Sequence, residues 1–254
     1  MFAPGAIGIN LHKKIIKNVL TKLNINVIIR YKLKRKEIKI MEKKYIVLDT
    51  ETTNSLDDPM AYDIGFAVID EYGAVYETHS YVIADVFLDK DLMASAYFAD
   101  KIPQYWEDIK NGTRRLVKLN TARIILKEVM ERYNTNIVIA HNARFDYRSL
   151  STTQRFLTSS KYRYLLPYGT EVWDTLKMSR EALKNNVEYD NFCYNNGYLT
   201  KRGCKRYTAE IIYRFLTDNI DFIESHTGLE DVLIEKEIFV FCMKNGVNDG
   251  RLWK

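Results

Sequence analysis

Short apolar runs that end in polar clusters predict β-strands in the first half of the chain. The run at 44–50 and the four-residue run at 137–140 are both apolar enough to be buried strands. Two further stretches, 62–70 and 75–84, are joined by residues 71–74, whose composition is typical of a hairpin turn. These segments indicate a β-sheet that begins near residue 44.

Helical periodicity takes over in the second half. Apolar residues recur every three or four positions over 121–133, and similar patterns predict helices at about 143–158, 175–184, 208–216 and 228–244. A group of strands followed by strand–helix alternation is typical of an α/β fold. We therefore expect a mixed β-sheet flanked by α-helices.

The first 40 residues have a different character from the rest. They hold ten Lys or Arg and one acid, so the leader carries +9 while residues 41–254 carry −4. Basic residues alternate there with apolar ones at helical spacing, as in a membrane-surface helix or a transit peptide. Alternatively Met41 is a start, since Met41-Glu42-Lys43-Lys44 leads directly into the first strand. We expect residues 1–40 to lie outside the fold and residues 41–254 to form one domain.

Composition narrows the function classes for residues 41–254. No run approaches 18 apolar residues, so a stable membrane span is not expected. Three cysteines without a C-x-x-C pair argue against a disulfide framework or a zinc knuckle and favour a reduced, cytoplasmic location. The net negative charge of residues 41–254 would not attract nucleic acid by itself. Metal ions at the acidic clusters would reverse the sign locally.

Acidic residues follow both of the predicted buried strands. Asp49 and Glu51 end the first strand, and because side chains alternate, both carboxylates point to one face with Cα atoms about 6.5 Å apart. Asp146 falls in the first turn of the helix after 137–140, with Asn142 as the predicted N-cap. Ligand sites in open α/β sheets gather at such edges.

A third cluster precedes the last helix. Thr227 and Glu230 fit a capping box, which places Asp231 in the first turn and His226 just before it. The ordinary pKa of histidine, near 6.5, suits a general base at neutral pH. His141, at the end of a predicted buried strand, is the alternative base.

These three clusters resemble the exonuclease motifs of the DEDDh family, which includes proofreading epsilon-type subunits, RNase T and oligoribonuclease. The matching segments are Asp49-x-Glu51, Asn142-x-x-Phe145-Asp146 and His226-x-x-x-x-Asp231, in this order within residues 44–244. The resemblance implies a ribonuclease H-like fold. Asn54 stands where the family commonly has Gly after the paired threonines, which affects only the path of that turn.

The resemblance also implies a mechanism. Two divalent ions, Mg²⁺ or Mn²⁺, would be held by four carboxylates: Asp49, Glu51, Asp146 and Asp231. His226 would deprotonate the attacking water, and the backbone of Thr50 and Thr52 would contact the terminal nucleotide. The Phe145 ring is a candidate for stacking on a base.

The expected reaction is 3′→5′ hydrolysis of single-stranded DNA with release of 5′-nucleoside monophosphates. RNA 3′-end trimming is the nearest alternative, and a catalytically silent nucleic-acid-binding or polymerase-associated module is a further one. A polymerase or replication protein is a candidate partner in trans. Residues 198–207, with four basic residues and two tyrosines, would be either a hairpin that grips the strand backbone or a solvated loop.

Overall fold

The protein is described from a computed structural model over residues 43–53, 58–159, 161 and 163–253. The basic leader at 1–40, the candidate start at Met41 and the departure at Asn54 lie outside these residues. Within the described ranges, no helix combines the length and apolar character that a bilayer span requires.

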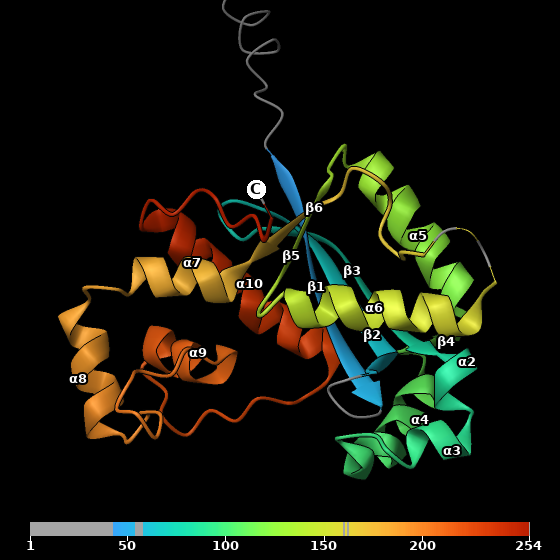
Figure 1. Cartoon of the computed structure of the whole chain (residues 1–254), viewed down its shortest axis with the longest axis horizontal. Coiled ribbons are helices and arrows are strands. Elements are labelled where there is room, and N and C mark those ends of the chain that lie inside the picture. The colour runs from blue at the N-terminus through green and yellow to red at the C-terminus, as the bar shows by residue number, and fades with distance from the viewer. Residues whose placement is uncertain (1–42, 54–57, 160, 162, 254) are drawn as a thin grey trace, which may run out of the picture. The chain divides into compact units, whose positions relative to one another are not determined.

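Six strands form one mixed sheet in the order β4-β3-β2-β1-β5-β6 (Figure 1). The strands are β1 (Lys44–Thr53), β2 (Met60–Asp70), β3 (Val75–Ile83), β4 (Arg115–Val117), β5 (Ile137–Ala140) and β6 (Glu171–Asp174). β1, β2 and β3 pair antiparallel, whereas the β3–β4, β1–β5 and β5–β6 pairs are parallel. The predicted α/β, ribonuclease H-like fold class is confirmed.

The alternation of β1 side chains divides the apolar core into two layers. Ile46 and Leu48 belong to one buried cluster, and Tyr45 and Val47 belong to another on the opposite face. The first face is covered by α5 (Leu119–Arg132) and α6 (Arg144–Leu157), and the second by α7 (Thr175–Ala182), α9 (Ala209–Thr217) and α10 (Gly228–Lys244). Asp49 and Glu51 continue the second series, so their carboxylates face α10.

The expected helices and strands are all present, and seven further elements were not predicted. All five expected helices form, with bounds within two residues of those predicted. The additional elements are α2 (Ala84–Phe87), α3 (Lys90–Met93), a 3₁₀ turn η1 (Ala99–Lys101), α4 (Ile102–Asn111), β4, β6 and α8 (Val187–Asn195). The segment from α2 to α4 forms a small helical group beside β3 (Figure 1).

Candidate active site

The first acidic cluster lies at the carboxyl end of β1. Asp49 is opposite Gly65 of β2 and Glu51 is opposite Asp63, and the register shifts immediately after Glu51. Glu51 is 8% exposed, whereas Asp49 keeps more of its surface open to solvent. The two carboxylates therefore lie on one face of the sheet, as predicted.

The second cluster reaches the same edge of the sheet from α6. Asp146 is buried, and its Oδ1 accepts hydrogen bonds from the Thr50 backbone N–H at 3.2 Å and from Thr50 Oγ1 at 2.8 Å. The prediction of Asn142 as the helix N-cap was wrong, because α6 begins one residue later with Ala143 at that position. Asn142 instead has φ +63°, and its backbone N–H donates to Asp174. Asp146 is in the first turn, as predicted.

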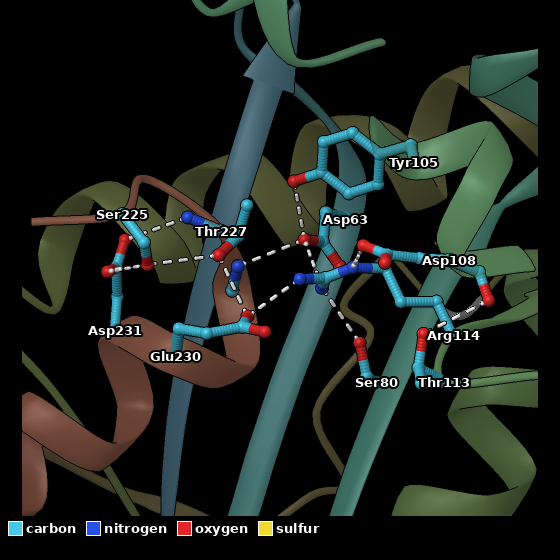
Figure 2. Close-up of polar contacts among 11 residues, drawn as sticks. Asp63, Ser80, Tyr105, Asp108, Thr113, Arg114, Ser225, Thr227, Glu230 and Asp231 are labelled. Carbon is cyan, nitrogen blue, oxygen red and sulfur yellow. Dashed lines mark hydrogen bonds and ion pairs between the residues drawn. The ribbon is translucent and has the colours of Figure 1, made fainter. Parts of the chain in front are cut away.

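The third cluster begins α10, where Thr227 is the N-cap (Figure 2). The capping box was only partly right. Asp231 Oδ2, not the Glu230 carboxylate, accepts the Thr227 N–H at 3.1 Å, and Thr227 Oγ1 donates to Glu230 Oε2 at 2.8 Å. Ser225 Oγ donates to the other oxygen of Asp231. These contacts fix the orientation of the Asp231 carboxylate.

A buried ionic network attaches the start of α10 to β2 (Figure 2). Asp63 Oδ2 accepts the Gly228 N–H at 2.9 Å and the Tyr105 hydroxyl at 2.7 Å. The Arg114 guanidinium, almost wholly buried, pairs with Asp63 at 3.2 Å and with Glu230 at 2.7 Å. Because Asp63 is the cross-strand partner of Glu51, Arg114 offsets the repulsion between these two acids.

His226 lies directly before α10 in an unusual backbone conformation. Its φ is +54°, in the left-handed region that non-glycine residues seldom adopt. Its imidazole stacks on the Phe98 ring with centroids 4.1 Å apart and planes 11° apart. One ligand atom from each of Glu51, His226 and Asp231 lies within 4.8 Å of the others. His226 is therefore held beside the carboxylates.

His141 has both ring nitrogens engaged in structural contacts. Nε2 lies 2.7 Å from the Tyr207 carbonyl oxygen, which can only accept, so Nε2 carries the proton. Nδ1 lies 3.0 Å from Thr175 Oγ1. Burial lowers the pKa of this imidazole. His141 also lines the cleft, and the choice between the two candidate bases stays a prediction.

Acidic and basic side chains line the same cleft, which has a volume of about 520 Å³. The acidic and histidine side chains that line it are Asp49, Glu51, His141, Glu224, His226, Asp231 and Glu235. The lining also includes Arg180 of α7 and the segment from Lys205 to Ala209. Residues 198–207 form a small hairpin with an antiparallel bridge between Leu199 and Lys205, and its Arg206 and Tyr207 contribute to the cleft wall.

The three residues expected to contact nucleotide lie at the margin of this site. Thr50 and Thr52 are 5% and 8% exposed, and the Thr50 hydroxyl donates a hydrogen bond to Asp146. Phe145 is partly buried, with the Arg148 guanidinium 6.0 Å from its ring centroid. The lining of the cleft does not include these three side chains. Their contact with a nucleotide stays a prediction.

Burial and mutual repulsion raise the pKa of every clustered carboxylate. Burial, followed by the charge of Asp231, raises the pKa of Glu51 to about 9. Burial also raises the pKa of Asp231 to about 8, and that of Asp146 to about 7 although the Thr50 hydroxyl opposes the shift. Although Asp49 keeps some exposed surface, dense surroundings and the charge of Asp146 raise its pKa well above the usual range. Such a cluster favours binding of protons or cations.

The free energy of unfolding of the metal-free protein should therefore fall as pH rises from about 4 to about 9. Unfolded carboxyl groups ionise near pH 4, whereas the folded protein retains protons on Glu51, Asp146 and Asp231 to higher pH. The folded state binds more protons across this window, so stability is greatest at its acidic end and declines toward its alkaline end. Urea unfolding in chelator across the window measures the decline. Glu51→Gln should flatten it, and identical slopes for both proteins would contradict the assignment.

The residues of this site that were not identified from the sequence include Arg180, Glu224, Glu235 and Phe98. Glu235 follows Asp231 by one helical turn and could have been found as a second acid at i, i+4 on the same face of the last helix. Phe98 carried no local signal, because its contact with His226 joins segments 128 positions apart.

No family model and no curated protein sequence matches this chain. Solved structures of exonuclease I match its fold. A product-bound structure of exonuclease I is 14% identical over 78% of this chain and 42% of that chain, with a TM-score of 0.50. The zinc-bound complex of E. coli exonuclease I with single-stranded DNA is 14% identical over 80% of this chain and 40% of that one, with a TM-score of 0.49. The chain thus spans about two fifths of the length of the exonuclease I chains it matches, and the likeness establishes a common fold.

Proposed function

We propose that this protein is a metal-dependent 3′→5′ exonuclease that hydrolyses single-stranded DNA and releases 5′-nucleoside monophosphates. The observation that carries the proposal is the convergence of Asp49, Glu51, Asp231 and His226 on one cleft, with Asp146 directly behind it. These residues come from three distant segments and match the DEDDh motifs in order. The fold in common with exonuclease I supports the same class of reaction.

The donor set fits hard divalent cations such as Mg²⁺ or Mn²⁺, which prefer carboxylate oxygens. Glu235 Oε2 is buried and, within the described part of the chain, has no hydrogen-bond partner, as expected for an oxygen that faces a cation. The residues that would hold two ions are Asp49, Glu51, Asp146 and Asp231. When bound, the ions would stabilise the negative charge that develops on the phosphodiester and the leaving 3′ oxygen.

The basic side of the cleft would orient the strand. Arg180, Arg206 and Tyr207 line the same cleft as the acids. Guanidinium groups bind phosphate oxygens, and an aromatic ring stacks on bases without sequence preference. The hairpin at 198–207 would therefore hold the backbone on the 5′ side of the scissile bond.

The proposed general base is His226, which would take a proton from the attacking water. His226→Ala should lower the turnover rate by about 10²–10⁴-fold, the usual effect of removing a general base. Burial lowers the pKa of His226, so the wild-type rate should rise with pH below about 6.5 and then level off. This acidic limb should be lost in the variant.

His141→Gln is the matched control for that experiment, because its ring makes structural contacts on both nitrogens. It should keep the acidic limb of the pH profile even if the rate falls. If His141→Gln loses the limb and His226→Ala keeps it, the base has been assigned to the wrong histidine.

Incubation with 5′-labelled DNA and RNA oligonucleotides, in Mg²⁺ or in EDTA, tests the proposal as a whole. A ladder that shortens by one nucleotide on DNA and disappears in EDTA is the expected result. The same ladder on RNA alone would favour 3′-end trimming. Binding without cleavage would favour the silent, polymerase-associated module.

Cellular context is also part of the proposal. Cys193, Cys204 and Cys242 are all free thiols, which supports a reduced, cytoplasmic location. A polymerase or replication protein as a partner in trans stays a prediction, and co-purification from cells would test it.

A further inference from the structure

Glu235 is a buried acid on the wall of the cleft that the DEDDh motifs do not include. It lies on α10 one turn after Asp231, so the two side chains share a helix face. Only 3% of its surface is exposed. The His141 backbone N–H donates to its carboxylate, whereas Oε2 receives no hydrogen bond from any residue that the structure describes.

The surroundings of Glu235 are acidic. The strongest charge interactions of its carboxylate are with Asp146, Glu224 and Asp231. Glu235 is in turn among the main charges acting on Asp49, after Asp146. Glu235 lines the same cleft as Asp49 and Asp231.

A buried acid in this position is unfavourable for the fold. A desolvated carboxylate beside other carboxylates is strongly destabilising unless a cation and hydrogen bonds compensate it. A glutamine would occupy the same volume, accept the His141 N–H and avoid the repulsion. The negative charge at this position thus contributes nothing to folding that an amide could not provide.

We infer that Glu235 is a fifth carboxylate of the metal centre, where it supplies an oxygen and a negative charge to the ion that Asp49 and Asp146 would hold. This inference rests on the proposed metal-dependent function. It assigns to α10 two metal-directed acids at i, i+4, Asp231 and Glu235. The position of the first turns of α10 would then depend on whether the ion is bound.

Metal affinity, measured without substrate, tests the inference. Mn²⁺ is titrated into the metal-free full-length protein by calorimetry, and free Mn²⁺ is followed by its EPR signal. Glu235→Gln should weaken binding by about tenfold or more at the affected ion, the range found for groups that support metal ligands. Glu235→Asp keeps the charge but shortens the side chain, and it should lose less affinity than the glutamine variant.

Glu224→Gln is the matched control, because it removes one negative charge from the same cleft. It should change Mn²⁺ affinity by less than about threefold, since it removes only a neighbouring charge. Unchanged affinity in Glu235→Gln, or an equal loss in Glu224→Gln, would overturn the inference. Circular dichroism confirms that each variant is folded, and Glu235→Asp provides the test if the glutamine variant does not fold. Absence of Mn²⁺ binding by the wild-type protein would instead refute the proposed metal-dependent function.

Discussion

Asp49→Asn should abolish hydrolysis of single-stranded DNA while the protein remains folded. Asp49 lines the cleft at the end of β1, and Asp146, Glu235, Glu51 and Asp231 are the charges that act on it most strongly. Removing its charge would remove one of the carboxylates that would hold the proposed ions. The loss of transition-state stabilisation should lower the rate by about 10³-fold or more. The measurement is single-turnover cleavage of a 5′-labelled oligonucleotide in Mg²⁺.

The same substitution should not destabilise the metal-free protein. In the absence of cations, burial and then the charges of neighbouring acids disfavour the ionised form of Asp49 and raise its pKa. An amide of the same shape removes the repulsion, so the melting temperature in EDTA should be unchanged or higher than that of the wild-type protein. Loss of activity together with retained stability separates a catalytic role from misfolding.

Asp91→Asn is a suitable control, because Asp91 is an exposed acid on α3. It should cut at the wild-type rate. If Asp49→Asn also retained the wild-type rate, the site would have to be sought elsewhere in the molecule. If it lost both activity and stability, Asp49 would be part of the folding core.

The elements that could be predicted are those whose sequence pattern is long enough to be distinctive. β1 contains the apolar run at 45–48, β5 is apolar throughout, and α10 is a 17-residue helix with its N-terminal signals in place. β4 and β6 have three and four residues, too few to show a period. They form because the edges of the sheet offer backbone partners, which is a property of the tertiary structure.

The candidate site divides along similar lines. The four candidate acids could be predicted because Asp49 and Glu51 lie near the end of a strand, and Asp146 and Asp231 lie in the first turn of a helix. Phe98 stacks on His226 through a helical segment that is positioned only by the complete fold. The ion pair between Glu230 and Arg114 could not be predicted either, because the two residues are 116 positions apart in the sequence. A capping box explains the choice of residues at the start of α10 but not the ionic network.

The close approach of β2 and α10 leads to the largest expected effect on stability. Gly65 is opposite Asp49 in the sheet, and a Cβ atom built on it would lie 2.2 Å from the carbonyl carbon of Gly228 and 2.3 Å from the backbone nitrogen of Leu229. Both contacts are with backbone atoms, so no side-chain rotation relieves them. Gly65→Ala must push the first turn of α10 away from the sheet. We expect it to lower the free energy of unfolding by about 3 kcal/mol or more.

Activity should fall in Gly65→Ala even at temperatures where the protein is folded, because His226 and Asp231 move with the first turn of α10. Urea unfolding measures the loss of stability. Mn²⁺ titration measures the displacement of the side chains that would hold the metal. Gly250→Ala is the matched control, since its Cβ would meet the Sδ atom of Met178 at 2.5 Å. The next nearest atoms are Met178 Cγ at 3.0 Å and Trp173 Cβ at 3.2 Å, which are also side-chain atoms. Because no backbone atom of α10 has to move, the loss of stability should be smaller than in Gly65→Ala. If the two variants lost equal stability and both kept wild-type Mn²⁺ affinity, contact between β2 and α10 could not be what holds the third acidic cluster beside the first.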